Sequence, residues 1–245
     1  MLNRIKNNLS KFFPIRIGRF LIINTGAKKL TEDESLFIHP QLKLKKAKRD
    51  DVILKFCAGM RVLHFGFLDY PITEDKLVSG NLLHSKIRKV ANSLYGIDVD
   101  SKSLDFYRHL TGDYNNMSED ILSYGSDVSF LANSCDVIIF PEVLEHISNP
   151  GAALLSLKQI LLINPGSRLL ISVPNAYSLL HFSSACNEIE LVHADHYFYF
   201  SPTTLRKLLT DSGFNDIEIS LYSWYDLNAK TPGICEHGVI SVCTV

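Results

Sequence analysis

Two acidic residues and a histidine directly follow a short apolar segment in the middle of the chain. Residues 137–140 are all apolar, and residues 141–146, PEVLEH, come next. An apolar run of this length is typical of a buried parallel strand. Ligands of open α/β sheets bind beyond the carboxyl ends of such strands, so we expect Glu142, Glu145 and His146 to lie near a ligand. Carboxylates and an imidazole there could bind polar groups or transfer protons.

Another acid stands at the end of a second apolar segment. Residues 94–99 favour a strand, with Asp98 near its tip. A carboxylate in this position can accept hydrogen bonds from both hydroxyls of a ribose. The alternative is that Asp98 caps the next helix, but we expect Ser101 to provide that cap.

A regular framework must position these residues, and the alternation of helix and strand patterns from residue 47 onward predicts one. Short connections between the elements indicate a parallel sheet covered on both faces. We therefore expect an α/β fold with a doubly wound, mostly parallel sheet of seven strands and a terminal antiparallel hairpin. The expected strands are 61–65, 94–99, a weak one within 114–134, 137–140, 169–173, 217–223 and 238–245. The expected helices are 50–58, 82–93, 101–109, 150–163 and 202–212.

Several segments resemble the class I S-adenosylmethionine-dependent methyltransferases. They are DVIIFPEVLEHISNP at 136–150, GSRLLISVPN at 166–175 and DHYFYFSPTTLRKLLTDSGF at 195–214. The resemblance covers about residues 50–245 and implies an enzyme with a Rossmann-like fold whose cofactor is S-adenosylmethionine. We therefore expect a methyltransferase domain over 50–245. Residues 1–49 resemble no family and are expected to form a basic, helical extension.

The resemblance also implies a cofactor site, in which this chain departs from the family pattern. The family usually has an acid and three glycines at the end of its first strand, but residues 62–71 are VLHFGFLDYP. Only Gly66 remains to let the backbone approach a ligand closely, and His64 replaces the acid. The segment is similar to a minority variant in which Asp69 would bind the cofactor's amino group. An ordinary strand-to-helix turn is the alternative, and the additional length at 70–81 could form a lid or a substrate loop.

The remaining cofactor contacts follow from the same resemblance. Val99 would contact the adenine ring, and the acidic turn at 118–121 would bring Asp120 to its other side. The cofactor-binding residues implied are therefore His64, Gly66, Asp69, Asp98, Val99, Asp120, Pro141 and Glu142.

Histidines are the candidate catalytic residues. A sulfonium cofactor supplies its own electrophile, so the protein chiefly aligns an acceptor and excludes water. A hydroxyl acceptor benefits from a general base, which is commonly histidine. The candidates are His146, His181 and His193, whereas His196 begins an aromatic run that is more typical of a core; a packing role is the alternative for each. A subset of these histidines with Glu142 or Glu145 could bind a metal, but no spacing demands it, so none is expected.

Composition restricts the location and the partners. The chain of 245 residues is 46% hydrophobic and 21% charged, which is ordinary for a soluble protein. Its five cysteines form no Cys-x-x-Cys pair, and no apolar run is long enough for a membrane span, so we expect a cytoplasmic protein. Residues 1–50 hold twelve Lys and Arg against four Asp and Glu, whereas residues 51–245 hold thirteen against twenty-two. This asymmetry fits either a solvated basic face or a surface for an anionic partner.

The expected activity is methyl transfer from S-adenosylmethionine to oxygen of a small molecule or a sugar, with an anionic acceptor favoured by the basic N-terminus. The partner is thus a small-molecule or glycan acceptor, and peripheral membrane contact through residues 1–49 is a further option. No aromatic signature of RNA binding accompanies the basic residues, so nucleic acid is not expected. Two alternatives stay open: an inactive relative that binds a partner protein, suggested by the lost glycines, and an NAD-dependent oxidoreductase, disfavoured because no G-x-G-x-x-G follows the first strand. The oligomeric state is left open.

Overall fold

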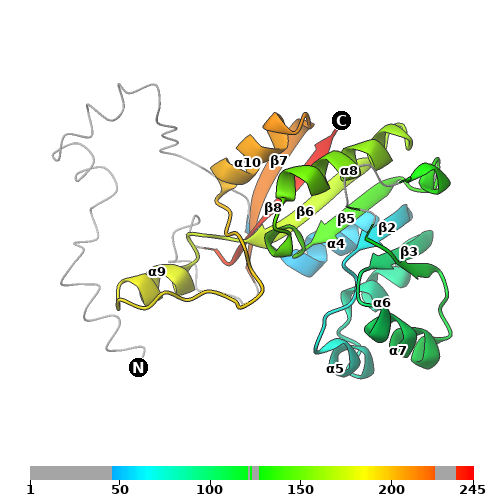
Figure 1. Cartoon of the computed structure of the whole chain (residues 1–245), viewed down its shortest axis with the longest axis horizontal. Coiled ribbons are helices and arrows are strands. Elements are labelled where there is room, and N and C mark those ends of the chain that lie inside the picture. The colour runs from blue at the N-terminus through cyan, green and yellow to red at the C-terminus, as the bar shows by residue number, and fades with distance from the viewer. Residues whose placement is uncertain (1–45, 121, 123–126, 224–235) are drawn as a thin grey trace.

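The computed structural model describes residues 46–120, 122, 127–223 and 236–245. Within these residues one eight-stranded sheet has the order β1-β7-β8-β6-β5-β2-β3-β4 (Figure 1). Neighbouring strands are parallel, except that β8 is antiparallel to both β6 and β7. The strands are β1 (Lys46–Lys48), β2 (Arg61–Phe65), β3 (Ser93–Asp98), β4 (Asn116–Ser118), β5 (Val137–Pro141), β6 (Arg168–Pro174), β7 (Asn215–Ser223) and β8 (Gly238–Thr244).

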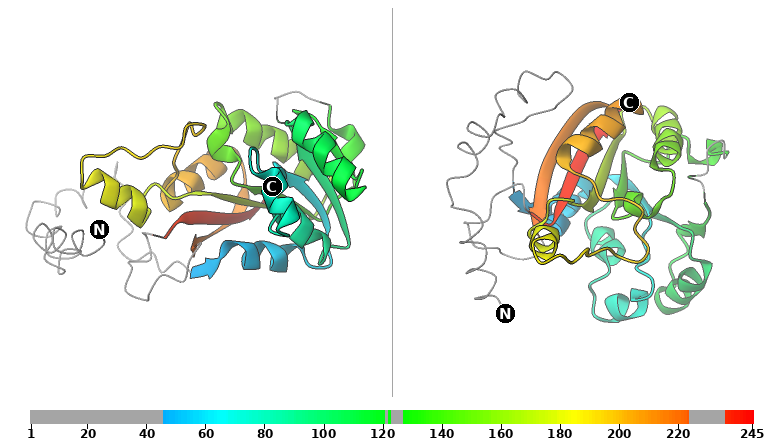
Figure 2. Two further views of the ribbon diagram at one scale, coloured as in Figure 1. Left: turned by 90° about the horizontal axis from the view of Figure 1, so that it is seen from below. Right: turned by 60° about the vertical axis from the view of Figure 1, so that its left-hand side comes forward.

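Helices cover both faces of the sheet, as Figure 2 shows for α4 on one side and α8 with α10 on the other. The α-helices are α4 (Arg49–Cys57), α5 (Thr73–Val78), α6 (Leu83–Arg88), α7 (Ser101–Thr111), α8 (Pro150–Leu162), α9 (Leu179–Ala185) and α10 (Pro202–Asp211). Two 3-10 turns are also described, η1 (Ser129–Leu131) and η2 (Leu144–His146).

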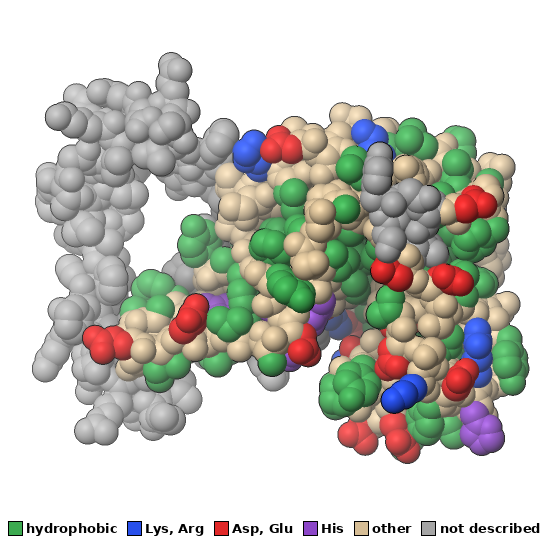
Figure 3. Space-filling view, in the orientation of Figure 1, with side chains coloured by type: hydrophobic (Ala, Val, Ile, Leu, Met, Phe, Trp, Pro, Cys, Tyr) green, Lys and Arg blue, Asp and Glu red, His purple; other side chains and the backbone are tan. Residues whose placement is uncertain are grey.

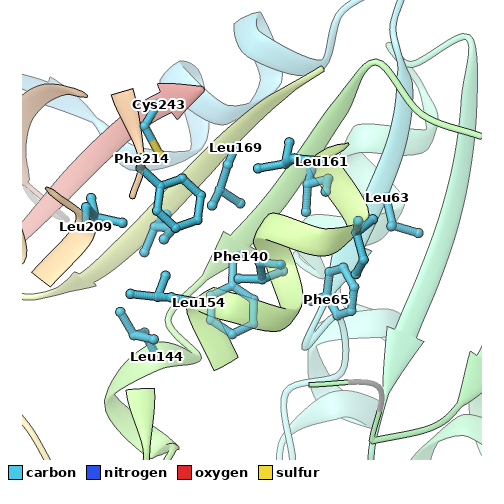
Figure 4. Close-up of a cluster of buried hydrophobic side chains, with 14 of the residues drawn as sticks. Leu63, Phe65, Phe140, Leu144, Leu154, Leu161, Leu169, Leu209, Phe214 and Cys243 are labelled. Carbon is cyan, nitrogen blue, oxygen red and sulfur yellow. The ribbon is translucent and has the colours of Figure 1, made fainter. Parts of the chain in front are cut away.

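Two apolar clusters hold the layers together. On one face, Leu154 and Leu161 of α8 pack with strand residues such as Phe140 and Leu169 (Figure 4). On the other face, Ile53 of α4 and Ile87 of α6 pack with β2 and β5. Every residue of β5 is buried because helices cover both of its faces. Burying one such large side chain contributes about 2–3 kcal/mol, which makes the central strands a rigid support for the loops at their ends.

The expected fold class is confirmed. Strands β3, β2, β5 and β6 are neighbouring and parallel, and β7 and β8 form the expected antiparallel hairpin. The described sheet has an eighth strand because Lys46–Lys48 pairs with the edge of β7. Three residues with two lysines carry no apolar pattern, so backbone pairing alone decides this strand. The helix expected in residues 1–49 lies almost wholly outside the described residues.

Local details differ from expectation in three places. The helix expected over 82–93 is shorter, because α6 ends at Arg88 and Ser93 already pairs with Arg61 in the sheet. The segment 70–81 contains the short helix α5. The cap of α7 is Asp100, whose carboxylate accepts from the backbone N–H groups of Lys102 and Ser103 at 3.1 and 3.2 Å. The expectation that Ser101 is this cap was therefore wrong.

Residues 176–199 form an arm that leaves the carboxyl end of β6 and returns to it. The two ends meet because Asn175 and Phe200 form a parallel β-bridge. On its return the arm contacts η2, where the backbone N–H of Tyr197 donates to the carbonyl oxygen of Glu145 at 2.8 Å. The arm carries α9 and lies outside the layered body (Figure 1).

The helices in the described part of the chain are all too short or too polar to cross a membrane.

Candidate functional site

A cleft of about 720 Å³ lies at the carboxyl ends of β2, β3 and β5. The chain builds β3 and β4 on one side of β2 and then β5 and β6 on the other, so the cleft lies at the topological switch point of the sheet, where such folds bind ligands. In Figure 3 a hollow separates the arm from the lobe of α5, α6 and α7. The predicted site residues that line the cleft are His64, Gly66, Asp69, Asp98, Val99, Pro141, Glu142 and His146.

A second cavity, of about 630 Å³, lies beside the amino-terminal ends of β2 and β3. Among the described residues, its lining includes Val62, Leu94 and Phe130, but no histidine or acid. The cleft at the carboxyl ends therefore has the carboxylates and the imidazole that favour proton transfer, whereas the polar side chains of this cavity are Arg88 and residues with neutral groups.

Asp98 links two loops at the floor of the cleft. Its Oδ2 accepts from the backbone N–H of Leu68 at 2.8 Å, and its Oδ1 accepts from that of Asp100 at 3.0 Å. Burial raises the pKa of Asp98, while these backbone N–H groups act in the opposite direction by favouring the carboxylate. Each oxygen has a second lone pair, so the carboxylate can still accept hydrogen bonds from a ligand.

Gly66 brings the end of β2 against the residues that follow β5. Its φ is +63°, and a Cβ built on it would lie 2.3 Å from Cγ2 of Val143. A side chain at position 66 is therefore excluded by both the backbone conformation and the packing. The backbone N–H of Gly66 donates to the carbonyl oxygen of Ile97 at 2.8 Å, which fixes the loop to the tip of β3.

The carboxylate of Glu142 is held from the neighbouring strands. Its Oε1 accepts from the hydroxyl of Ser172 at 2.6 Å, and its Oε2 accepts from the hydroxyl of Tyr222 at 2.8 Å. The backbone of Glu142 has a φ of +53°, which a non-glycine residue adopts only at a cost of about 1 kcal/mol. This conformation turns the chain sharply at the end of β5, next to Gly66.

His64 contributes a buried neutral ring. Its side chain is 1% exposed, and its Nδ1 lies 3.2 Å from Nδ1 of the equally buried His84. Desolvation, with the nearby charge of Arg88, lowers the pKa of His84 to about 3, and desolvation also lowers that of His64. Two uncharged rings can share one N–H···N hydrogen bond, so position 64 has no negative charge to offer a ligand. Asp69 lies farther out and forms an ion pair of 2.8 Å with Lys76.

Three histidines gather where the arm returns to the cleft. Nδ1 of His146 lies 3.2 Å from the carbonyl oxygen of Asp195. An acceptor at Nδ1 requires the N–H there, so the free lone pair is on Nε2. The ring of His196 lies 4.5 Å from that of His146 and 4.6 Å from that of His193, measured between centroids.

The described residues that line the cleft do not include His181, His193 or Asp120. Nδ1 of His181 lies 2.7 Å from Oγ of Ser178, at the beginning of α9. Asp120 is exposed after β4, although the acidic turn begins beside the cleft, since the backbone N–H of Glu119 donates to the carbonyl oxygen of Asp98.

Several cleft residues were not foreseen from the sequence. They are Arg49 at the start of α4, Lys76 of α5, the backbone N–H of Leu68, and Asp195 in the arm. A backbone donor leaves no signature in residue types, and Asp195 is brought to His146 only by the return of the arm. Arg49 and Lys76 resemble ordinary surface cations in sequence.

The comparisons with known proteins agree with this geometry. Residues 79–219, more than half of the chain, match the family described as "Methyltransferase domain". Comparison with curated proteins found no match. The chain thus belongs to the methyltransferase domain family, and it is an S-adenosylmethionine-dependent methyltransferase.

Solved structures share the fold at low sequence identity. A methyltransferase from Thermotoga maritima, described as a possible histamine N-methyltransferase, has a TM-score of 0.56 at 14% identity, with 80% of this chain and 86% of that chain covered. A methyltransferase in complex with the Trm112 activator from Haloferax volcanii has 0.54 at 16%, with 79% and 86% covered. The small RNA methyltransferase HEN1 has 0.55 at 17%, with 80% and 24% covered. These likenesses establish the fold.

The cleft fits the cofactor of this family. Asp98 offers carboxylate oxygens at the tip of β3, and the backbone at Gly66 carries no side chain beside them. The acids Asp98 and Glu142 give part of the lining a negative charge that suits a sulfonium cation, whereas the charge of Asp69 is paired with Lys76. These comparisons favour a methyltransferase over the NAD-dependent oxidoreductase considered from the sequence.

Proposed function

We propose that the protein methylates a hydroxyl oxygen of a small molecule or a sugar. The observation that supports this proposal is the free Nε2 lone pair of His146 in the wall of the cleft. When bound, S-adenosylmethionine supplies an electrophilic methyl group on a positively charged sulfur. A neutral hydroxyl is a poor nucleophile. An acceptor of this class therefore needs a group that removes the hydroxyl proton or makes it more acidic.

His146 is the residue to which we assign this activation. The carbonyl of Asp195 fixes the tautomer and the orientation of its ring, which keeps Nε2 available. His193 lies beside it, with ring centroids 6.0 Å apart, and its side chain is 59% exposed, so it is a second route for the proton. His181 is engaged with Ser178 and is less suited to this role.

The cofactor would lie along the loops that Asp98 joins. We assign hydrogen bonds to the ribose hydroxyls to Asp98, the adenine contact to Val99, and recognition of the amino group of the methionine portion to Asp69. The side chain of Val99 is 70% exposed and lines the cleft, which supports its assignment to the adenine contact. Asp120 is the weakest member of this set because it is exposed away from the lining.

The acceptor is proposed to carry an anionic group. Lys102 lines the cleft and could attract such a group, whereas Arg49, which also lines it, is paired with Asp50. The basic residues of the N-terminus that first suggested it, among them Arg4 and Lys6, lie outside the described residues. Four other expectations likewise stay predictions. They are a division of the chain near residue 50, membrane contact through residues 1–49, an acceptor other than nucleic acid, and a cytoplasmic location.

Titration calorimetry with S-adenosylhomocysteine tests the cofactor site. We expect the full chain to bind one equivalent, and Asp98→Asn to weaken binding at least tenfold, because the variant loses the charge while keeping the side-chain size. Asp105→Asn is the matched control, since the Asp105 side chain on α7 is 82% exposed. Absence of binding to the wild-type chain would support the inactive relative instead, and equal affinities of the two variants would remove Asp98 from the site.

Transfer to oxygen is tested with labelled S-adenosylmethionine and a panel of phenols, sugars and sugar acids. We expect labelled methyl ethers, and a loss of at least a hundredfold in kcat for His146→Gln with little change in S-adenosylhomocysteine affinity. Label found only on amines, carbon or carboxylates would contradict the assignment.

A further inference from the structure

The side-chain carboxyl group of Glu145 is buried, and its oxygen atoms form no hydrogen bond with the described residues. The side chain is 1% exposed. A buried carboxylate of this kind is rare unless it is paired or coordinates a cation.

Two imidazoles lie within reach of this carboxylate. Nε2 of His146, which carries the free lone pair, is 4.0 Å from Oε1 of Glu145. His196 completes a group in which one donor atom from each residue lies within 4.8 Å of the others. The Nδ1 atom of His196 is buried and has no hydrogen-bond partner in the described part of the chain. Three ligand-type side chains with unused donor atoms therefore converge on one point.

The backbone holds the three residues in this arrangement. Glu145 and His146 are consecutive in η2, and the return of the arm is fastened to them by the N–H of Tyr197 on the carbonyl oxygen of Glu145. The hydrogen bond from Nδ1 of His146 to the carbonyl oxygen of Asp195 is the kind of outer contact that commonly orients a metal-binding imidazole. Because His196 directly follows Asp195, the hydrogen bond between His146 and the carbonyl oxygen of Asp195 also helps to position the ring of His196.

The donor set and its spacing suit a divalent transition-metal ion. Ligand atoms bound at about 2.1 Å to one tetrahedral ion lie about 3.4 Å apart, so the widest pair in this group needs to close by up to about 1.4 Å. One carboxylate with two imidazoles is a set that binds Zn²⁺, Mn²⁺, Fe²⁺ or Co²⁺. We propose that Glu145, His146 and His196 bind such an ion at the wall of the cleft, with positions left open for the acceptor.

This inference deepens the proposed function and rests on transfer to oxygen. The acceptor's hydroxyl oxygen would bind the ion, which lowers the pKa of the hydroxyl, and its proton would pass to water at the mouth of the cleft. A lone pair of that oxygen then forms the new C–O bond while the methyl–sulfur bond breaks, and the electron pair of the broken bond stays on the sulfur. In this arrangement His146 activates the hydroxyl through the ion rather than by taking the proton itself.

The test is metal binding by the full chain after treatment with EDTA and buffer exchange. Titration with Zn²⁺ by calorimetry and with Co²⁺ by visible absorption is expected to show one ion per chain. Glu145→Gln and His196→Gln are each expected to weaken binding at least tenfold. Glu190→Gln and His109→Gln, at exposed positions of the arm and of α7, are the matched controls and should bind as the wild type does.

Folding and cofactor binding are measured on the same samples. The melting temperature and the affinity for S-adenosylhomocysteine should change little in the two site variants, which separates loss of ligands from loss of fold; a variant that fails to fold is replaced by His146→Gln. Absence of one-to-one binding, or binding unaffected by the site variants, overturns the ion site even where S-adenosylhomocysteine binds normally. Ion binding that depends on Glu145 and His196, in a chain that binds no S-adenosylhomocysteine, would support the ion site and overturn the proposed transfer.

Discussion

The backbone N–H of Leu68 donates to Oδ2 of Asp98 at 2.8 Å, across thirty residues of sequence. This hydrogen bond joins the loop after β2 to the tip of β3. The family pattern places several glycines in that loop, whereas this chain has one, and the Asp98 carboxylate helps to hold the loop in its place. The same carboxylate thus has a structural and a proposed ligand-binding role.

The first prediction concerns Gly66→Ala. A positive φ costs alanine about 1 kcal/mol, and the new methyl group would overlap Cγ2 of Val143. We expect the free energy of unfolding to fall by more than about 2 kcal/mol, with weaker binding of S-adenosylhomocysteine. Gly112→Ala is the control, because φ there is +67° but a Cβ would contact nothing within 4 Å. Urea denaturation of both variants measures the difference, and equal losses would argue against the Val143 contact.

The second prediction concerns the support of Glu142. Tyr222→Phe removes the hydroxyl that donates to Oε2 of Glu142 inside the protein. Loss of a buried hydrogen bond to a charged group costs about 1.5–3 kcal/mol, and a less fixed Glu142 should weaken S-adenosylhomocysteine binding several-fold. Tyr114→Phe, at a side chain that is 70% exposed, should change neither quantity. Unchanged affinity in Tyr222→Phe, measured by calorimetry, would mean that Glu142 needs no such positioning.

The third prediction is that the protein loses stability at acidic pH, in part because the buried ring of His84 resists protonation in the folded state. Its folded-state pKa is about 3, well below the value near 6.5 of an unfolded chain. The unfolded state therefore binds more protons below pH 6.5, so stability is complete above that pH and falls as the pH decreases from 6.5 toward 3. The expected loss is about 1.4 kcal/mol per pH unit for this one group. His84→Gln should reduce the slope of unfolding free energy against pH by about one proton.

The exposed His109 of α7 provides the comparison for that experiment. His109→Gln should retain the slope of the wild type, as measured by urea denaturation between pH 7.5 and 5. Identical slopes for the wild type and His84→Gln would show that the buried ring takes up its proton without unfolding.

The fourth prediction concerns the ion pair between Arg61 and Asp136, at the amino ends of β2 and β5. The guanidinium donates to Oδ1 of Asp136 at 2.7 and 3.1 Å, and these hydrogen bonds lower the pKa of that carboxyl. A lowered pKa stabilises the fold above the unfolded value near 3.9, and this contribution is lost as the pH falls through the lower folded value. Both side chains are about two-fifths exposed, so solvent screening keeps the effect small.

We therefore expect Asp136→Asn to lower the melting temperature by about 2–3 °C at pH 7 and by less at pH 3. Asp105→Asn removes a more exposed acid and should have no measurable effect. An equal decrease at both pH values for Asp136→Asn would indicate that packing, and not charge, is responsible.

Much of the fold could be predicted because its strongest signals are local. The apolar segments 137–140 and 169–173 can be buried on both faces only as central strands, and they are β5 and β6 of the sheet. The helices expected from residues 150 and 202 begin there as α8 and α10. The side chains of Asn149 and Ser201 cap them and a proline of fixed φ follows each cap, so these signals act on adjacent residues. Gly66, Asp98 and Glu142 each stand at or just after the end of an apolar strand segment, so the same local signals predict that they lie at one edge of the parallel sheet.

The sequence by itself determined the fold class, the edge of the sheet at which the cleft lies and the acid at the tip of β3, because apolar patterning and strand direction fix these without knowledge of distant contacts. Only the tertiary structure decided that Glu145, His146 and His196 meet, since the arm must leave the sheet and return before His196 reaches η2. It also decided which ring nitrogen of His146 is free, because the carbonyl of Asp195 belongs to a segment 49 residues away. Contacts of this kind depend on how loops pack, so they cannot be predicted from the residue types along the chain.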